Sequence, residues 1–469
     1  MIPVLSPEEM SGVDRRATEP VEVLVGRAGA AVAKRAARLL QGAYGKHIKI
    51  VAGKGNNGAD GRTAARFLGE RGARVVVLEA SDLPPGCDLG PCDLVIDAAY
   101  GTGLQRAYHP PRARSRVLAV DIPSGVNGTT GLVPEGGGAL QAVATVTFAS
   151  LKPGLLLGAG PELAGEVEVA DIGLGDLVGE VARCSLVEDA DVRAAFASRP
   201  REAHKWQSAV QVVAGSPGMT GAPWLVSRAA LRSGAGYVRL SMPGVNPSVL
   251  PPSELVHLPV PEAGWHDKVL EEISRVKALV VGPGLGPLAS GEASTGASLP
   301  GGEVGLLLAS AQVPAVVDAD GLNAIGNLDA LGEIVSRREE PTVVTPHEGE
   351  LTRLAGRAPG PDRVAAVRSA AAKSGAIVLL KGSTTVVASP SGDVLLSATG
   401  GPRLATAGTG DVLSGVIAGL MARGVPPFLA AALGAHVHGR AAQRGFSEGL
   451  VASDLPDLVA GWLSELRAQ

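Results

Sequence analysis

Residues 405–415 read ATAGTGDVLSG, and the organisation of the second half of the chain can be worked out from this stretch. A turn of small residues, Gly408-Thr409-Gly410, runs through Asp411 into an apolar sequence with helical spacing. The N–H groups and the dipole at such a helix start favour a phosphate or a developing oxyanion. Asp411 would repel that anion unless it has a task, such as taking a proton. The alternative is an acid that only stabilises the helix start.

The segments before this helix repeat one arrangement, in which a β-rich run ends in polar or glycine-rich residues and a helix then begins. Such runs occupy residues 210–214, 278–286, 314–318, 342–345 and 377–380. They deliver Asp318 and Asp320 in DADGLN, His347 and Glu350 in TPHEGE, and Lys381 in KGSTT. The repeat predicts a doubly wound α/β domain whose site lies at the carboxyl ends of its strands.

The first half contains a β–turn–α–β pattern. A strand at residues 47–53 runs into GKGNNGADG at 53–61, a helix at 62–71 and a second strand at 74–79. The glycines of its GxGxxG, at positions 53, 55 and 58, favour nucleotide binding in a Rossmann-like doubly wound domain. The alternative is that they only make a tight crossover.

Three oxygen-bearing side chains of this half follow separate strands. Asn57, Asp97 and Ser124 each lie just past a strand end, so their oxygens are expected to converge at one edge of the sheet. They are hard ligands with one full charge among them, which suits a monovalent cation better than zinc or magnesium. Each alone is equally well explained as a turn or cap residue.

The composition bounds the function classes. The chain has 469 residues, enough for two domains, and its net charge of −4 gives no support for nucleic-acid binding. No apolar run reaches the length of a membrane span, and Cys87, Cys92 and Cys184 fit a reducing compartment better than a disulfide framework. We therefore expect a cytoplasmic homo-oligomer that binds small molecules but neither nucleic acid nor membranes.

The charged segment at residues 186–201 ends near Pro200, where we place the boundary between domains 1–198 and 199–469.

The motifs of the second half, GSPGMTGA, GPGLG, DADGLN, TPHEGEL, KGSTT and LATAGTGDVLSG, resemble those of the ADP-dependent NAD(P)H-hydrate dehydratases of the ribokinase-like superfamily, over residues 186–465. The resemblance implies that the hydrated nicotinamide nucleotide contacts Ala222, Gly286, His347 and Asp411. It implies that the adenine nucleotide contacts Lys381, Gly382, Ser383, Thr384, Thr385 and Gly410. Asp411 would be the general base, and Glu350 would position magnesium, directly or through water.

The motifs of the first half, GNNGAD, DAAYGTGL, DIPSGV and TFASLKPGL, resemble those of the NAD(P)H-hydrate epimerases, over residues 3–175. That resemblance implies potassium at Asn57, Asp97 and Ser124. Epimerisation by opening or by protonating the ring at C6 would use Asp121, with Lys152 nearby, as acid–base groups. The resemblance also implies substrate contacts from Asn56, Asn57, Gly58, Ala59, Asp60, Gly101, Thr102, Gly103, Leu104, Gln105, Arg106, Ala107 and Asp121. Ala59 departs from the glycine usual in that family, and would disfavour a positive φ there.

Together the two resemblances imply a metabolite-repair enzyme. One domain would epimerise the R and S forms of hydrated NADH or NADPH. The other would dehydrate the S form with ADP, restoring the reduced nucleotide and releasing AMP and phosphate. One alternative is a ribokinase-like small-molecule kinase fused to a nucleotide-binding domain, which would leave a stable phosphorylated product. A second is a nucleotide-sensing protein with no turnover.

Overall fold

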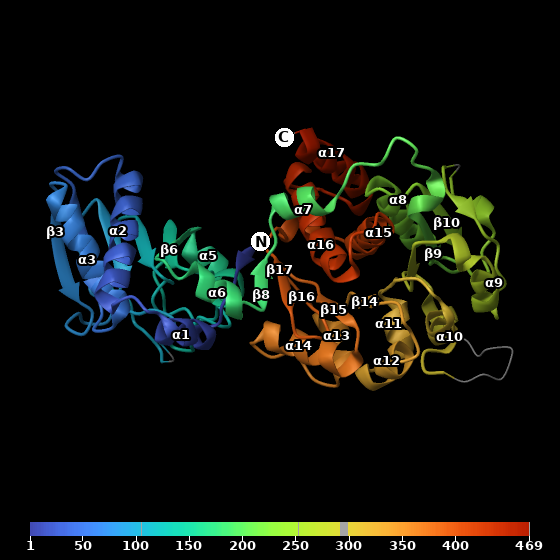
Figure 1. Cartoon of the computed structure of the whole chain (residues 1–469), viewed down its shortest axis with the longest axis horizontal. Helices are drawn as coiled ribbons and strands as arrows, with labels where there is room; N and C mark the ends of the chain where they lie inside the picture. Colours follow the sequence, from blue (N-terminus) through green and yellow to red (C-terminus); the bar gives the residue numbers. More distant parts are fainter. Residues whose placement is uncertain (105, 252, 291–298, 469) are drawn as a thin grey trace. The chain divides into compact units, whose positions relative to one another are not determined.

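The computed structural model describes residues 1–104, 106–251, 253–290 and 299–468 (Figure 1). It divides into one unit spanning Ile2–Ser185 and a second that comprises Met1 and the chain from Leu186 onward. This division falls earlier than the expected boundary near Pro200. The charged segment at residues 186–201 contains three apolar side chains that are buried in the core of the second unit: Val187, Val192 and Phe196. Val187 also donates its N–H to Leu396 O (2.9 Å).

The first unit is built on a six-stranded sheet in which every neighbouring pair is parallel. The strands lie in the order β3 (Arg74–Glu79), β2 (His47–Ala52), β4 (Leu94–Ala98), β5 (Val117–Val120), β6 (Ala144–Phe148) and β7 (Glu166–Ala170). Two short strands are β1 (Ile2–Pro3) and β8 (Cys184–Leu186). The helices are α1 (Pro7–Arg16), α2 (Val21–Leu40), α3 (Asn56–Glu70), α4 (Pro153–Leu156), α5 (Gly160–Ala164) and α6 (Gly175–Val181).

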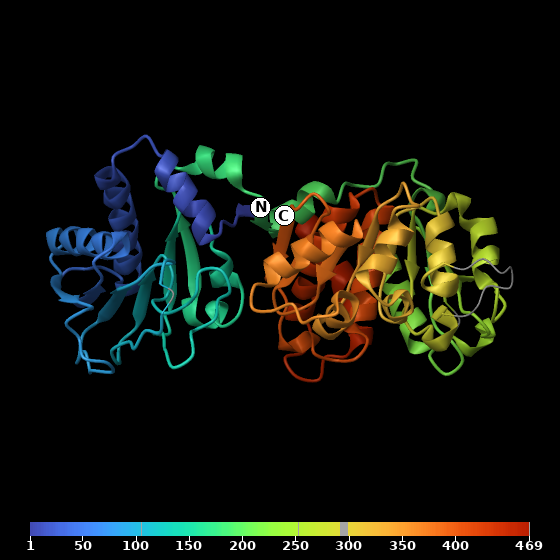
Figure 2. The ribbon, with the colours of Figure 1, turned by 90° about the horizontal axis from the view of Figure 1, so that it is seen from below.

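Both faces of this sheet are covered, because successive strand residues point to opposite sides. Ile48 and Ile50 of β2 lie in the cluster that includes apolar residues of α2 and α3, whereas Val51 lies in the cluster on the other face. Figure 2 shows the blue helices α2 and α3 together on one face of the sheet. The strand order reverses direction at β2 and β4, and such a switch point is where doubly wound sheets place their ligand crevice.

The helix α3 begins at Asn56, six residues earlier than the expected start at Arg62. The GNNGAD motif therefore forms the first turns of a helix and not a loop. Glycine makes this possible, since a Cβ on Gly58 would lie 1.8 Å from Gly53 O. Ala59 lies in the same helix and is not among the residues with positive φ, so its methyl group brings no backbone strain.

The sheet of the second unit runs β17 (Val394–Ser397), β16 (Thr385–Ala388), β15 (Ile377–Leu380), β14 (Thr342–Val344), β13 (Ala315–Val317), β12 (Ala278–Val281), β9 (Ala209–Val213), β10 (Tyr237–Ser241) and β11 (Val256–His257). The pairs β15–β16 and β16–β17 are antiparallel, and the other neighbours are parallel. The order reverses at β9, between β10 and β12, so this sheet also has a switch point.

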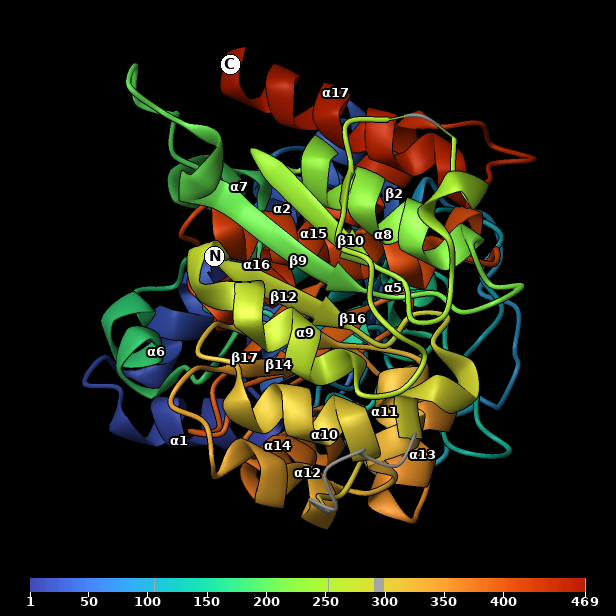
Figure 3. The ribbon, with the colours of Figure 1, turned by 90° about the vertical axis from the view of Figure 1, so that its right-hand side faces the viewer.

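The helices of this unit form a layer on each face of the sheet. Figure 3 shows α15 (Thr409–Ala422), α16 (Pro427–Arg444) and α17 (Leu455–Ala468) on one side, with α7 (Asp189–Ala195) and α8 (Gly221–Arg232) nearby. On the other side lie α10 (Gly302–Ser310), α12 (Leu328–Val335) and α14 (Arg363–Ser374). The remaining helices are α9 (Trp265–Glu272), α11 (Asp320–Ile325) and α13 (Glu348–Ala355).

The helix α15 is buried on nearly every side, which explains why its sequence is apolar all round. Its glycines allow a close approach to α8, because a Cβ on Gly415 would lie 2.2 Å from Val226 O. The helix that carries Asp411 is therefore packed closely against α8. Within the described residues, no helix combines the length and the apolar character needed to cross a membrane.

Candidate active sites

The helix α15 begins at the glycine-rich turn where the sequence predicts an anion nest. Gly408 is the N-cap in a left-handed conformation (φ 87°), which glycine adopts without strain. The Thr409 hydroxyl donates to Leu404 O (2.9 Å) and Thr406 O (3.0 Å), so the preceding loop is tied to the helix. The N–H groups of a first helical turn have no partner within the helix. They can therefore bind an anion at this point.

A network of charged groups surrounds this nest. Asp318, at the end of β13, is 1% exposed and accepts hydrogen bonds from Lys381 Nζ (2.8 Å) and Ser414 Oγ (2.7 Å). A Cβ on Gly410 would lie 3.4 Å from Lys381 Nζ and 3.9 Å from Asp318 Oδ2. Lys381 Nζ also lies 3.9 Å from Glu350 Oε2. The sequence motifs DADGLN, TPHEGE, KGSTT and GTGD thus meet at one place.

The electrostatics of this network prepare Asp411 to accept a proton near neutrality. Burial raises the pKa of Asp411 to about 6, and the carboxylates of Asp318 and Asp320 add to the rise, while Lys381 opposes it. Burial by itself would lower the pKa of the Lys381 ammonium, but Asp318 and Glu350 raise it. A base whose pKa lies just below the working pH is charged and ready, yet accepts a proton easily.

His347 is partly a structural residue. It is the N-cap of α13, where its Nδ1 accepts the N–H groups of Gly349 (3.0 Å) and Glu350 (3.2 Å). Glu350 Oε2 accepts the His347 N–H in return (2.7 Å), which completes a capping box. The second ring nitrogen, Nε2, lies 3.6 Å from Glu350 Oε1, outside the capping box. The turn interpretation of His347 thus accounts for its Nδ1, while Nε2 faces the Glu350 carboxylate.

The other predicted residues of this unit lie around two loops. Gly286 has a positive φ of 55°, and its N–H donates to Asp320 Oδ2 (2.9 Å). A Cβ on Gly284 of the same loop would lie 3.1 Å from the Ala222 Cβ, so the loop after β12 packs on the first turn of α8 at the switch point. The segment from Lys381 to Thr385 connects β15 to β16, with Gly382 and Ser383 exposed and Thr384 and Thr385 buried.

Sequence reasoning placed Asp318 at a strand end but assigned it no role in the site. The available signal was its position at the end of a buried strand in DADGLN. It also missed His438 of α16, which is 5% exposed and whose pKa is lowered to about 4, by burial first and then by Lys381. A histidine buried in the middle of an apolar helix carries no sequence signal of its neighbours.

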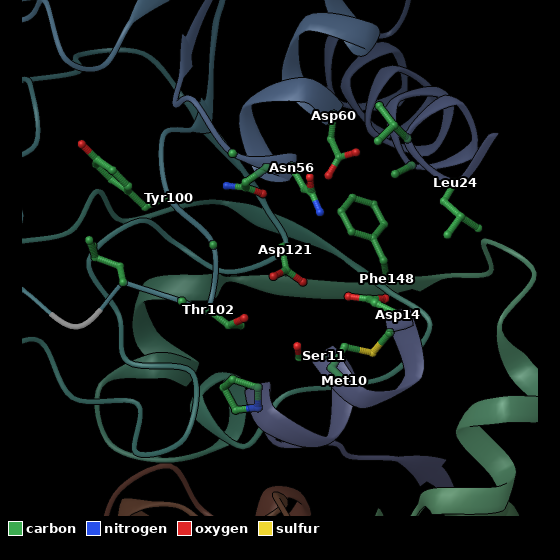
Figure 4. Close-up of a pocket in the computed structure, with 18 of the residues that line it drawn as sticks. Met10, Ser11, Asp14, Leu24, Asn56, Asp60, Tyr100, Thr102, Asp121 and Phe148 are labelled. Carbon is green, nitrogen blue, oxygen red and sulfur yellow. The ribbon is translucent and has the colours of Figure 1, made fainter. Parts of the chain in front are cut away.

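The first unit contains a cavity of 610 Å³ (Figure 4). Many of the predicted substrate residues line it: Asn56, Asn57, Asp60, Gly101, Thr102, Gly103, Leu104 and Asp121. Gly58, Ala59, Arg106 and Ala107 are not part of the lining, and Gln105 lies outside the described residues. Gly58 is instead needed for the close approach of α3 to Gly53. Asp14 of α1 and Phe148 of β6 also line the cavity, and the sequence reasoning missed both.

Asp121 and Lys152 form a buried ion pair in this cavity. Lys152 Nζ lies 2.7 Å from Asp121 Oδ1 and donates to Thr147 Oγ1 (2.8 Å) and Phe148 O (3.0 Å). Asp121 has a positive φ of 67°, which is uncommon for a residue other than glycine. Such backbone strain is concentrated at functional sites, and here it accompanies the carboxylate that the sequence reasoning selected.

The expected potassium residues provide an oxygen-rich environment. Asp97 is 1% exposed and accepts the N–H (2.9 Å) and the hydroxyl (2.7 Å) of Ser124. Both polar atoms of the Asn57 side chain are buried without a hydrogen-bond partner. The Ser124 contacts are those of a turn residue, whereas an unpartnered buried amide oxygen near a strand end fits a hard monovalent ion. Among the described residues, no group of three or more His, Cys, Asp or Glu is placed to hold a metal.

The two sites define a class of protein: a two-domain α/β enzyme with a large cavity in one unit and, in the other, a glycine-rich helix start that carries a buried carboxyl group. A family model described as NAD(P)H-hydrate dehydratase matches residues 210–462. A model described as YjeF-related protein N-terminus matches residues 21–87 and 78–154. A ribokinase-like superfamily protein from Enterococcus faecalis has a TM-score of 0.50 with 20% identity, covering 61% of this chain and 98% of its own. This last match confirms the ribokinase-like fold of the second unit.

Bifunctional NAD(P)H-hydrate repair enzymes are similar over nearly the whole chain. The enzyme from Salinibacter ruber is 36% identical, over 97% of this chain and 95% of its own length. The enzyme from Moorella thermoacetica is also 36% identical, over 98% of this chain and 96% of its own length. The chain therefore belongs to the family of bifunctional NAD(P)H-hydrate repair enzymes, as the sequence motifs predict.

Proposed function

We propose that the second unit dehydrates the S form of hydrated NADH or NADPH with ADP as the phosphoryl donor, and that the first unit interconverts the R and S forms. The observation that supports the first part best is the Asp411 carboxyl, whose pKa is raised to about 6, in the first turn of α15 beside Lys381. The relatives named as bifunctional NAD(P)H-hydrate repair enzymes support both parts.

The chemistry of dehydration follows from the nature of the leaving group. The hydrate carries a hydroxyl on C6 of the nicotinamide ring, and a hydroxyl leaves poorly whereas a phosphate leaves readily. Asp411 takes the proton of the C6 hydroxyl, and the hydroxyl oxygen attacks the terminal phosphorus of ADP as the bond to AMP breaks. The N–H groups of the GTGD nest stabilise the charge on the transferring phosphoryl. Phosphate then leaves with help from the ring-nitrogen lone pair, and loss of a proton from C5 of the resulting iminium forms the C5–C6 double bond of the reduced nicotinamide.

The charges of this site support a requirement for a divalent cation. Asp318, Asp320, Glu350 and Asp411 outnumber the single ammonium of Lys381, so a diphosphate would add negative charge to an acidic surrounding. Glu350 Oε1 lies outside the capping box and 3.6 Å from His347 Nε2, and this oxygen would hold magnesium directly or through water. The ion would offset charge on the diphosphate.

Potassium would bind to Asn57, Asp97 and Ser124 of the first unit. It would hold the start of α3 close to the loop after β5, and so stabilise the conformation of the two segments that line the proposed nucleotide site.

The test is incubation of the whole chain with both hydrate epimers, ADP and magnesium. Reduced nicotinamide is followed by its near-ultraviolet absorbance, and phosphate and AMP by chromatography. Complete conversion of both epimers with equal amounts of AMP and phosphate supports the proposal. A stable phosphorylated product would favour the small-molecule kinase, and tight nucleotide binding without turnover would favour a sensor.

A further inference from the structure

The cavity of the first unit brings together three carboxyl groups from three separate elements. Asp14 comes from α1, Asp60 from α3 and Asp121 from the segment after β5, and all three line the cavity. Figure 4 shows their carboxyl groups directed at the same space, around the ring of Phe148. The basic groups that face this space are Lys152, which precedes α4, and Lys54, which precedes α3.

The ammonium group of Lys152 forms an ion pair with Asp121. Its ammonium is 2.7 Å from Asp121 Oδ1, and Thr147 Oγ1 and the carbonyls of Phe148 and Ser150 accept from it at 2.8–3.3 Å. Lys54 is exposed. Asp60, by contrast, is 7% exposed and has no hydrogen bond or ion pair within the described part of the chain. A carboxylate buried without a partner is costly, and the neutral acid avoids that cost.

The surroundings of Asp60 hold it in the protonated form at neutral pH. Burial raises the pKa of Asp60 to about 8, the neighbouring carboxylates of Asp121 and Asp14 raise it further, and Lys152 opposes the rise. Burial also raises the pKa of Asp14, and Lys152 opposes that rise. Of the three carboxyl groups, Asp60 is therefore the one held in the acid form, and Asp121 is the one paired with an ammonium group. Two carboxyl groups whose surroundings separate them in this way are suited to act as acid and base in one reaction.

We propose that Asp60 is the acid of the epimerisation, donating its proton to the ring nitrogen, while Asp121 is the base that accepts the proton of the C6 hydroxyl. This inference rests on the proposed function of the first unit. It gives Asp60 a chemical role beyond the substrate contact that the GNNGAD motif implies.

The step balances without a co-reactant. The C6 hydroxyl loses its proton to Asp121, the C6–O bond becomes a carbonyl, and the bond between N1 and C6 breaks with its electron pair moving to nitrogen. Asp60 supplies the proton that N1 then carries, so the intermediate is an open enamine-aldehyde. Rotation about the bond between C5 and C6 presents the other face of the carbonyl. Ring closure reverses both proton transfers and leaves the hydroxyl on the opposite side.

The test measures conversion of the R form to the S form in the whole chain without ADP, so that the dehydratase unit is idle. The epimers are separated by chromatography, and the uncatalysed rate is subtracted. For Asp60→Asn we expect kcat to fall by ~10²–10⁴ with KM changed only a few-fold, as for loss of a general acid. The wild-type rate should fall as the pH rises above about 8, which gives the pH–rate profile a basic limb. The residual rate of the Asn variant should not show this fall. Dehydration of the S form with ADP should be unchanged.

Two further variants keep the test decisive if Asp60→Asn disturbs folding. Asp60→Glu keeps a proton donor and should restore part of the rate. Asp14→Asn removes one carboxylate that raises the pKa of Asp60, so the fall in rate at high pH should begin at a lower pH than in the wild type. Wild-type kcat in Asp60→Asn, or an unmoved limb in Asp14→Asn, would overturn the inference. A wild-type chain that does not epimerise at all would overturn the proposed function instead.

Discussion

Replacing Asp411 by Asn should stabilise the second unit while it removes dehydration. Raising the pKa of this group from 3.8 to about 6 corresponds to about 3 kcal/mol, because each pKa unit is worth ~1.4 kcal/mol. A carboxyl group with a raised pKa in the folded state binds protons more tightly there than in the unfolded chain. Stability from this group is therefore lost as the pH rises from 3.8 to about 6, and Asn, which has no charge, recovers it.

The expected gain in the free energy of unfolding depends on pH. It is about 3 kcal/mol near pH 8, where Asp411 is fully charged in both states, and about half of that near pH 5. Dehydration should fall by ~10²–10⁴ over the same range, as expected for loss of a general base. A site that gains stability when its base is removed shows the usual conflict between function and stability.

Urea unfolding followed by tryptophan fluorescence can measure this, because all four tryptophans of the chain lie in the second unit: Trp206, Trp224, Trp265 and Trp462. The matched control is Glu448→Gln, which removes an exposed acid and should change neither stability nor rate. An Asp411→Asn variant that is less stable than wild type near pH 8, or whose gain does not shrink on acidification, would refute the electrostatic reasoning. Near-normal turnover would refute the assignment of the base.

Three more outcomes follow from the same contacts. Asp318→Asn should move the acidic limb of dehydration to lower pH, since Asp318 raises the pKa of Asp411; an unmoved pH–rate profile would contradict this. Asp97→Ala should impair epimerisation and abolish any preference for potassium over sodium, while dehydration stays normal; an unchanged response to potassium would count against the site. Gly58→Ala should destabilise the first unit by about 1–3 kcal/mol, because its Cβ would lie 1.8 Å from Gly53 O; calorimetry should show only that unit melting earlier.

The motifs carried most of the second site without a structure. Polar residues after successive parallel strands must meet at one edge of the sheet, so Glu350 and Lys381 were predicted as site residues and Asp318 was placed at the same edge. The sequence did not predict which of these side chains pair with one another. Which carboxylate holds Lys381, and which raises the pKa of Asp411, depends on distances of a few ångströms between loops that are far apart in the sequence.

In the first unit, too, the motifs predicted most of the cavity residues, whereas the charge state of those residues depends on the tertiary structure. GNNGAD, DAAYGTGL and DIPSGV identified the family and most of the cavity from short contiguous patterns, since backbone turns and strand ends are encoded locally. The helical start of α3 at Asn56 was missed, because only the close approach of Gly58 to Gly53 makes a helix fit there. Asp14 was missed because α1 reaches the cavity through tertiary packing alone. Whether a carboxyl group is charged depends on burial and neighbouring charges, so only the folded structure makes Asp60 an acid.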